Sequence, residues 1–308
     1  MGTYVLRRIL QMIPVFIGAT LLIFLMVYTL PGDPIAALYG DKAADPAQVA
    51  QLRHLYYLDQ PIWKQYLHYM SNLLQGNFGT SFTGRSVTSL MGDAFPVTIR
   101  LALVAFFCEI FIGIPLGLLS GLYRGSMLDS LVLILTLVVI GIPVFVLAYI
   151  AQTIFATNLG WVTPTVQDST DITQLILPGV VLASLSLAFV ARLTRTSIGE
   201  NRRADYMRTA IAKGLPQRTV ITRHLLRNSL IPVVTFLGTD LGALMGGAIV
   251  TEGIFNIKGV GNLLYQAISH KEGPTVVGVV TVLVIVYLVA SLVVDLLYAV
   301  LDPRIRYA

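Results

Sequence analysis

Charged side chains are scarce in this chain. Asp, Glu, Lys and Arg make up 12% of its 308 residues, whereas soluble globular domains carry about 25%. The mean hydropathy is +0.77, and several apolar runs are long enough to cross a lipid bilayer. The formal net charge of +5 could suit nucleic acid, but the basic residues gather in loops between apolar runs. These features indicate an all-α integral membrane protein without a nucleic-acid partner.

Cysteine and catalytic signatures are also missing. The single cysteine, Cys108, lies inside an apolar run, so the sequence allows no disulfide framework and no cysteine metal site. No HExxH, GxSxG, CxxC or Walker A pattern occurs. The histidines lack metal-ligand spacing and stand in loops, at His54, His68, His224 and His270. We therefore predict no catalytic residue, no metal site and no bound cofactor, so any ATP-driven work must come from another subunit.

Six apolar runs organise the rest of the sequence. They cover residues 9–30, 97–122, 128–156, 175–190, 231–250 and 276–301. Length predicts a transmembrane helix for each run, although the fourth is short. Pro143 predicts a kink in the third run. Gly113 and Gly117 allow close helix packing in the second run.

The first run follows Arg7 and Arg8, as the apolar core of a signal peptide would. Such a core has about 7–15 residues and is followed by a small-x-small cleavage site. This run covers residues 9–30, and no such site follows it. We expect a retained first helix with a cytoplasmic N-terminus, in which Pro14 falls in the first turns, where proline is tolerated.

The basic residues support a topology with both termini in the cytoplasm. Of the 21 lysines and arginines, seven fall outside in that topology and 14 fall inside. Those inside are Arg7, Arg8, Arg124, Arg192, Arg195, Arg202, Arg203, Arg208, Lys213, Arg218, Arg223, Arg227, Arg304 and Arg306. The positive-inside rule therefore predicts both ends inside. The arginines between 192 and 203 are expected to meet anionic lipid head groups.

A polar segment between the first two runs divides the chain into three parts. Residues 1–30 form the N-terminus and first helix, residues 31–95 an extracytoplasmic segment, and residues 96–308 a core that includes a cytoplasmic loop at 197–230. No part of residues 31–95 is long and apolar enough to span a membrane. We expect short helices and loops there that pack as a module, with a simple spacer as the alternative.

A basic stretch between the fourth and fifth runs, residues 204–232, reads ADYMRTAIAKGLPQRTVITRHLLRNSLIP. It predicts a short amphipathic helix whose apolar face carries Met207, Ala210, Ile211 and Leu215. Gly214 followed by Pro216 is a stop signal. So short a helix needs a partner for its apolar face. The membrane surface and a groove on a soluble protein are equally suitable on physical grounds.

This stretch resembles the cytoplasmic EAA loop of permease subunits in binding-protein-dependent ABC importers. In the peptide-importer branch the loop reads close to DY-hydrophobic-RTARAKGL, followed by RHxLRNxLIP. The matching residues are Asp205, Tyr206, Arg208, Thr209, Ala210, Ala212, Lys213, Gly214 and Leu215, then Arg223, His224, Arg227, Asn228, Ile231 and Pro232. Arg208 and Thr209 replace the Glu and Ala of the wider superfamily, and Ile211 stands where the branch often has Arg. The resemblance implies a coupling helix docked on an ATP-hydrolysing subunit.

Other segments resemble the same family in the same order. They are PGDP at 31–34, residues 58–82, EGIFNIKGVGNLLYQAI at 252–268 and DLLYAVLDPRIRY at 295–307. The resemblance covers nearly the whole chain and is specific to the B-type permease subunit of bacterial dipeptide and oligopeptide importers. It implies the six-helix type I ABC importer (MetI-like) permease fold in the bacterial plasma membrane.

The same resemblance implies a set of partners. They are a second, homologous C-type permease subunit, ATPase subunits whose two nucleotide-binding domains hold ATP and Mg, an extracytoplasmic substrate-binding protein, membrane lipid and a peptide substrate. One permease supplies half of a translocation pathway. The chain is therefore expected to be a non-catalytic subunit that does not transport alone.

Candidate pathway residues lie inside the apolar runs. Burying a charge in lipid costs roughly 2.5–3.5 kcal/mol, so Glu109 and Asp240 suggest a polar lining that admits the ammonium group of a peptide. A hydrogen bond to a neighbouring helix, or protonation, is the alternative. Met245, Gly246 and Gly247 on the fifth run are candidates for a gate, and tight helix packing is the alternative for the two glycines.

Other functions stay open at this point. Relatives in the resembling family also carry nickel, glutathione or haem. A secondary transporter driven by protons through Glu109 and Asp240 would need no ATPase, but it predicts inverted repeats, which the sequence does not show. A membrane scaffold or enzyme subunit is a further alternative, and the enzyme version lacks a catalytic set.

Overall fold

The computed structural model of the chain describes residues 2–29, 35 and 45–301, and for residues 2–4, 52, 55, 247 and 293–301 the description covers the backbone alone. The PGDP motif at 31–34 and the basic residues Arg304 and Arg306 lie outside the described residues. Within them the regular structure is helical, apart from an isolated bridge between Thr80 and Ser86. The predicted all-α class is confirmed.

The chain divides into two compact units. The first contains residues 1–98 and 258–308, and the second contains residues 99–257. The N-terminal and C-terminal parts of the chain therefore fold together, while its middle part forms a unit of its own. The divisions predicted at residues 30/31 and 95/96 stay predictions.

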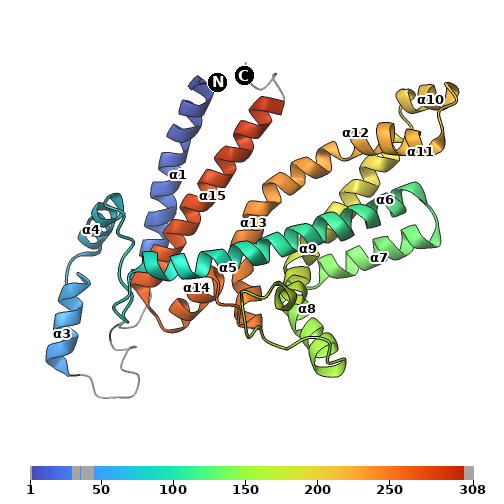
Figure 1. Cartoon of the computed structure of the whole chain (residues 1–308). Coiled ribbons are helices and arrows are strands. Elements are labelled where there is room, and N and C mark those ends of the chain that lie inside the picture. The colour runs from blue at the N-terminus through green and yellow to red at the C-terminus, as the bar shows by residue number, and fades with distance from the viewer. Residues whose placement is uncertain (1, 30–34, 36–44, 302–308) are drawn as a thin grey trace. The chain divides into compact units, whose positions relative to one another are not determined.

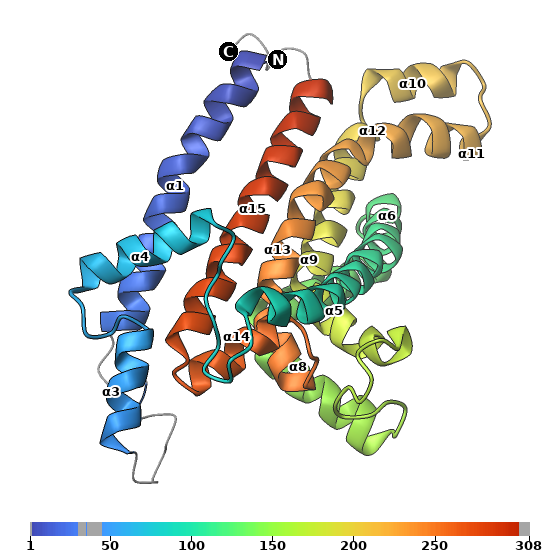
Figure 2. The same cartoon turned by 60° about the vertical axis from the view of Figure 1, so that its left-hand side comes forward.

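Two long apolar helices form the centre of the first unit. α1 (Gly2–Thr29) and α15 (Gly273–Leu301) lie side by side in Figures 1 and 2. The unit also contains α3 (Pro46–Leu55), α4 (Ile62–Leu74), the beginning of α5 (Val87–Cys108) and α14 (Val260–Ser269). Because α1 begins at Gly2 rather than at Ile9, Pro14 lies inside the helix. The prediction that Pro14 falls in the first turns is wrong.

The segment between α1 and α5 packs onto the two long helices. Tyr66 Oη on α4 lies 3.1 Å from Thr20 Oγ1 on α1. Tyr69, one turn further along α4, donates a hydrogen bond of 2.6 Å to Thr281 Oγ1 on α15. The described part of this segment is therefore a packed module with short helices, as predicted, and not a free spacer.

The loop before α5 lies tightly against the start of α15. The Glu272 carboxylate accepts hydrogen bonds from Ser81 Oγ and from the backbone N–H of Phe82. At Gly278 a Cβ atom would lie 2.3 Å from the carbonyl oxygen of Phe78, so only glycine allows this approach. These contacts fix the position of the loop on its own unit.

The second unit contains the rest of α5 and the helices that follow it. They are η1 (Glu109–Gly113), α6 (Ile114–Leu122), α7 (Met127–Gly141), α8 (Val144–Ala151), η2 (Gln152–Asn158), α9 (Ile172–Asn201), α10 (Asp205–Ala212), α11 (Gln217–Thr219), η3 (Val220–Leu226), α12 (Arg227–Ser229) and α13 (Ile231–Phe255). The η segments are π-helical, a wider and rarer form in which each N–H bonds five residues back.

Several helices are long and apolar enough to cross a membrane. Four qualify as continuous helices, over Val5–Thr29, Val87–Leu122, Ile172–Asn201 and Gly273–Leu292. Two bent pairs also qualify, Met127–Gly141 with Val144–Asn158 and Gln217–Ser229 with Ile231–Gly246. If each bent pair is one span, the described residues hold up to six spans. A protein with several spans is confirmed, and the number six stays a prediction.

Proline accounts for the sharper of the two bends. The axes of Met127–Gly141 and Val144–Asn158 differ by 109°. Pro143 stands between them in an extended conformation, with the φ of −57 that is typical of its ring and a ψ of 140. The predicted break at Pro143 is confirmed, although the chain turns much more strongly than a kink would require. This geometry places α8 beside both α9 and α13.

Glycines let α6 approach α9 at very short distance. A Cβ atom at Gly117 would lie 2.4 Å from the carbonyl oxygen of Ala191, and one at Gly121 would lie 2.8 Å from Ile198 Cβ. Gly113 is also tight, with Val190 Cγ1 only 3.0 Å from such an atom. The spacing of four residues puts these glycines on one face of the helix. The predicted close packing in the second apolar run is confirmed.

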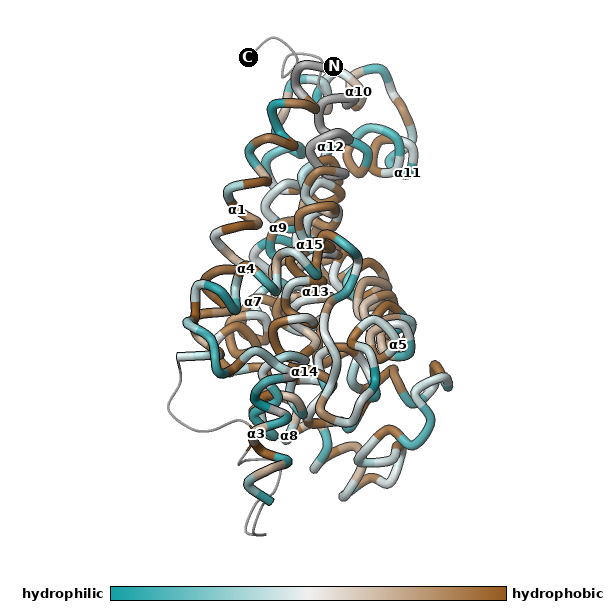
Figure 3. The backbone as a smooth tube through the Cα atoms, turned by 90° about the vertical axis from the view of Figure 1, so that its left-hand side faces the viewer, coloured by the Kyte–Doolittle hydropathy of each residue, from teal (hydrophilic) through white to brown (hydrophobic). Residues whose placement is uncertain are grey.

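The outward faces of the long helices are apolar. Large apolar side chains such as Leu22 and Met26 on α1 and Ile134 and Leu137 on α7 are exposed. Figure 3 shows apolar residues along most of α5 and α13. A soluble protein rarely exposes apolar patches of this extent, so these faces suit contact with lipid.

Candidate functional site

The α10 loop, which we define as residues 202–230, forms a compact helical hairpin after α9. Ala204 is extended at the N-cap of α10, and Asp205 lies in the first turn, where the helix dipole favours an anion. Gly214 follows α10 with φ +71, a left-handed conformation that glycine adopts without strain. Pro216 is then the extended residue before α11. The predicted helix and its stop signal are confirmed.

Part of the apolar face of α10 packs against the chain itself. Met207 and Ala210 are buried in a cluster with Ile198 of α9 and with Val220 and Leu225 of η3. The prediction that this whole face needs an external partner is wrong for Met207 and Ala210. The physical reason is that the basic second half of the loop also has an apolar side, which folds back onto α10.

The rest of α10 is exposed. Ile211 is 64% exposed and Leu215 is 37% exposed, so two apolar side chains remain uncovered. Leu215 belongs to the predicted coupling residues, and Ile211 does not. Seven further coupling residues are exposed: Asp205, Tyr206, Arg208, Thr209, Ala212, Lys213 and Gly214. Ala210 is the exception, because it is buried. This exposed side is therefore polar and basic around a small apolar centre.

Two contacts attach the α10 loop to the helices that precede it. Tyr206 donates a hydrogen bond of 2.6 Å to Asn201 Oδ1 at the end of α9. Arg202 Nη1 donates one of 2.8 Å to the carbonyl oxygen of Leu122 at the end of α6. Between α6, α10 and η3 lies a cavity of about 600 Å³ with mainly apolar walls. A displacement of α10 would therefore be transmitted to both α6 and α9.

An ion pair holds the ends of α6, α7 and α9 together near this loop. Arg195 donates to both carboxylate oxygens of Asp129, at 2.6 and 2.9 Å. Ser120 Oγ and the N–H of Gly125 bind the same carboxylate. The prediction that Arg195 meets anionic lipid is wrong, because its guanidinium group pairs with the Asp129 carboxylate. Sequence reasoning missed Asp129, although Ser126, the N-cap residue three positions before it, marks the start of α7.

The two intramembrane carboxyl groups predicted one by one form a pair. Glu109 is fully buried, and its carboxyl group adjoins that of Asp240 on α13. Neither oxygen of Glu109 receives a hydrogen bond from a donor group, and nor does Asp240 Oδ2. Glu109 also opens the π-helical segment η1. The structure thus brings these two candidates together at the centre of the second unit.

The gate candidates on α13 lie in a more open environment. Met245 is half-buried and Gly246 is exposed. For Gly247 the structure describes the backbone alone. A Cβ atom at Gly238 or Gly246 would meet nothing within 4 Å. These two glycines are not needed for packing within the chain, unlike Gly117.

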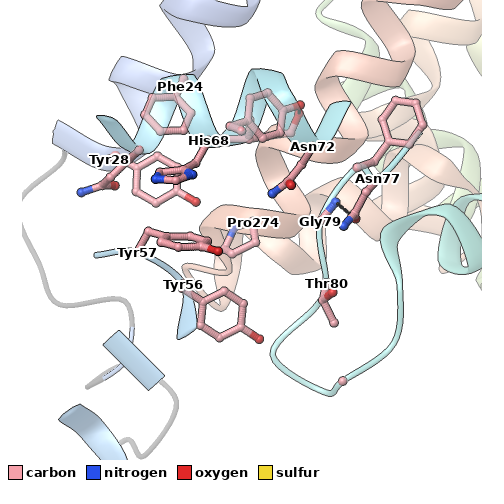
Figure 4. Close-up of a pocket in the computed structure, with 15 residues that line it drawn as sticks. Phe24, Tyr28, Tyr56, Tyr57, His68, Asn72, Asn77, Gly79, Thr80 and Pro274 are labelled. Atoms are coloured by element: carbon pink, nitrogen blue, oxygen red, sulfur yellow. Dashed lines mark hydrogen bonds between the residues drawn. The ribbon is translucent and has the colours of Figure 1, made fainter. Parts of the chain in front are cut away.

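An aromatic cavity of about 540 Å³ occurs in the first unit (Figure 4). The rings of Tyr57 and His68 stack there at 4.5 Å between centroids, and Phe24 packs against Tyr69 on α4. Burial raises the pKa of Tyr69 to about 12 and raises the pKa of Tyr56. Both hydroxyl groups therefore stay protonated and able to donate at neutral pH. Sequence reasoning predicted a packed module in this segment but not the cavity.

The described residues offer little for catalysis or metal binding. Among them, no group of three or more His, Cys, Asp and Glu side chains could hold a metal ion. The main features are long apolar helices, the α10 loop that is attached to α6 and α9, and the pair of Glu109 and Asp240. These features define a helical membrane protein with several candidate spans.

Comparison with known proteins shows which family this membrane protein belongs to. Residues 113–307 match the family described as binding-protein-dependent transport system inner membrane component, and residues 1–102 match the family of its N-terminal region. The chain belongs to this family of inner membrane permease subunits. Membership decides against an enzyme and favours a binding-protein-dependent importer over a proton-driven transporter.

Similarity to individual relatives extends over the whole chain. The chain is 36% identical to a dipeptide transport system permease protein of Alkalihalophilus pseudofirmus, and the match covers 100% of both chains. It is 36% identical to a di/tripeptide transport system permease protein of Pseudomonas aeruginosa, covering 100% of this chain and 99% of the relative. A glutathione transport system permease protein of Salmonella typhimurium is 37% identical, again over 100% of both.

Proposed function

We propose that this chain is one of two permease subunits of an ATP-driven peptide importer. Family membership supports the importer, and the names of two relatives that match over the whole chain support dipeptides or short oligopeptides. The observation that carries the mechanism is the uncovered side of α10, centred on Ile211 and framed by Lys213 and Arg208. It suits a groove on a soluble partner better than a purely apolar face would.

The partner at that surface is an ATPase subunit. Two such subunits, or two domains of one chain, bind ATP and Mg and close on each other. A second, homologous permease completes the translocation pathway, and an extracytoplasmic binding protein delivers the peptide. Both termini and the α10 loop lie in the cytoplasm, as the basic residues indicate.

Force passes through the contacts of the α10 loop. When the ATPase domains close, they displace α10 as a rigid body, because Met207 and Ala210 lock it to η3. The hydrogen bonds of Tyr206 and Arg202 carry this displacement to α9 and α6. The pathway alternates between outward and inward access, driven by the different contacts of its two states. Asp240, Met245, Gly246 and Gly247 on α13, with Glu109, are its lining and gate.

Substitution of Ile211 by Glu tests the coupling surface. An unpaired charge buried in the contact with the ATPase costs several kcal/mol, so the ATPase subunit should bind at least about tenfold more weakly. Uptake of a labelled dipeptide by the reconstituted importer should fall with it. Ala210 is unsuitable for this test, because a charge there would disrupt the packing of α10 on η3.

Ile172→Glu is the matched control. Ile172 is 59% exposed, close to the 64% of Ile211, and it lies at the opposite end of α9 from the α10 loop. This variant should insert and bind the ATPase like the wild type. Equal ATPase binding and equal uptake in the Ile211→Glu importer would contradict the coupling role.

Glutathione is the second candidate substrate, because a glutathione permease is 37% identical over the whole chain. Competition in the same uptake assay separates the two. Excess dipeptide should suppress uptake of labelled dipeptide, and glutathione should not. Competition by glutathione alone would reassign the substrate and leave the importer mechanism intact.

A further inference from the structure

Glu109 and Asp240 place two carboxyl groups against each other inside the second unit. Glu109 is 0% exposed, and both of its carboxyl oxygens lack a donor. The buried Oδ2 of Asp240 lacks one as well, and each carboxyl group is the other's electrostatic neighbour. Two adjacent carboxylates repel each other strongly where water is excluded. This arrangement is stable only if a positive charge lies between the two carboxyl groups.

The surroundings of the pair are apolar. Val190, Val233 and Leu237 form a buried cluster there, against which Phe106 and Ile110 also pack. Leu237 is three residues before Asp240, and Ile110 follows Glu109 directly. The pair therefore lies where the second apolar helix, α9 and α13 meet.

Within the described part of the chain, no basic side chain supplies the positive charge. The second apolar helix contacts α9 on both sides of Glu109: Val104 lies against Gly179, and Gly113 lies against Leu187. The α9 residues at the level of Glu109 are therefore those between 179 and 187. That stretch, VVLASLS, contains no ionisable residue. α8, which also packs on α9 and α13, carries only Tyr149, which is exposed.

The ionisable residues of the adjoining helices are directed elsewhere. On α5 they are Asp93, which pairs with Arg85, Arg100, which interacts with Asp168, and Cys108, a thiol next to Glu109 in sequence. On α9, Arg192 is exposed and Arg195 binds both oxygens of Asp129. Glu252, the other acid of α13, lies three turns beyond Asp240.

The backbone marks the same position. Glu109 is the first residue of η1, where the second apolar helix widens to a π-helical turn before it continues as α6. π-helical turns are rare and often occur at functional sites. The turn inserts an extra residue into the helix and so sets the direction of the Glu109 side chain independently of the glycine face that packs on α9.

We propose that Glu109 and Asp240 bind one proton between them and form a carboxylic acid–carboxylate hydrogen bond that joins the second apolar helix to α13. The proton comes from water, and the pair keeps a single negative charge. Among the described residues no third His, Cys, Asp or Glu joins the pair to hold a metal ion. The bound proton acts as a latch, because α13 cannot separate from the second helix without breaking this hydrogen bond.

The pH dependence of stability tests the latch. The permease, purified in its full transporter complex in nanodiscs, is unfolded by heat at a series of pH values. The folded wild type holds a proton that the unfolded chain has released, so its melting temperature should fall as the pH rises and the proton leaves the pair. In Glu109→Gln the amide N–H replaces the shared proton permanently, and this fall should be smaller. Asp93→Asn, at an exposed acid paired with Arg85, should keep the wild-type slope.

Infrared spectroscopy on the same samples gives a second measurement. The wild type should show the C=O stretch of a protonated carboxylic acid, and this band should disappear in both Glu109→Gln and Asp240→Asn. If one amide variant does not fold, the other carries the same comparison. Equal pH slopes in the wild type and the amide variants, or a wild-type spectrum without the band, would overturn the proposal. Neither measurement depends on peptide transport, so failure of the latch and failure of the importer assignment are distinguishable.

Discussion

At the scale of single residues, three acids of the second unit, Asp129, Glu109 and Asp240, are stabilised in two different ways. The Asp129 carboxylate receives hydrogen bonds from Arg195, Ser120 and the N–H of Gly125, so it is fully compensated as an anion. Neither carboxyl oxygen of Glu109 receives such a hydrogen bond, and nor does Oδ2 of Asp240. The first arrangement fixes three helix ends in one geometry, while the second leaves a bond that a change in protonation can break.

Removal of one partner from the Asp129–Arg195 pair should be strongly destabilising. The two side chains are only 4% and 17% exposed, and a buried charge that loses its partner typically costs about 3–5 kcal/mol. We expect Asp129→Ala to lower the melting temperature of the purified permease clearly. Asp129→Ala combined with Arg195→Ala should cost less than the sum of the two single substitutions, because no lone charge is left.

The exposed pair Arg85–Asp93 is the control for this prediction. Its side chains are 53% and 72% exposed, so Asp93→Ala should change stability by less than about 1 kcal/mol. A double substitution at 129 and 195 that is as costly as the sum of its parts would contradict the pairing.

Sequence patterns predicted residues with local effects and missed those that depend on distant partners. Pro143 and Gly214 act on their own backbone, so their turns could be foreseen. Arg195 and Asp129 are 66 residues apart, and nothing in the sequence says that they meet. Glu109 and Asp240 could be singled out because charge in lipid is costly, but only the fold shows that they are a pair.

At the scale of elements, the contact of α6 with α9 depends on glycine. An extra methyl group at Gly117 would have to displace the backbone at Ala191. Overpacking of this kind typically costs about 1–3 kcal/mol. We expect Gly117→Ala to lower the melting temperature of the full-length permease.

Gly246→Ala is the matched substitution on α13, where the added methyl group meets nothing within 4 Å of the same chain. It should leave the stability of the permease unchanged or raise it slightly, since alanine favours the helix. If Gly246 lies at the gate, the same variant should lower peptide uptake in the assembled importer. Equal melting temperatures for Gly117→Ala and the wild type would contradict the close approach of α6 to α9.

The α10 helix shows where sequence reasoning about elements ends. Amphipathic spacing predicted the helix and the side that would be covered. The spacing could not show what covers that side, because packing on the chain's own η3 and docking in an external groove both require the same apolar residues at the same positions. The structure assigns Met207 and Ala210 to the chain and leaves Ile211 uncovered. Packing on the chain thus stiffens the element that a partner would move.

At the scale of the whole molecule, the sequence predicted a membrane protein because lipid imposes strict rules on length, charge and apolar content. The permease class was predicted from the resemblance of the 204–232 stretch and of other segments to a known family. The family comparisons confirm that class over nearly the entire chain. What the rules do not determine is the association of the N-terminal and C-terminal parts in one unit, since that depends on contacts such as Tyr69 with Thr281.

Site-specific photo-crosslinking in the assembled transporter tests the central claim most directly. A photoreactive residue placed at Ile211 or at Lys213 should form a covalent product with the ATPase subunit, in a yield that changes when nucleotide closes the ATPase. The same residue at Ile172 should give no such product. Crosslinks from positions 211 and 213 to lipid alone, with the ATPase subunit present in the complex, would contradict the coupling function of α10.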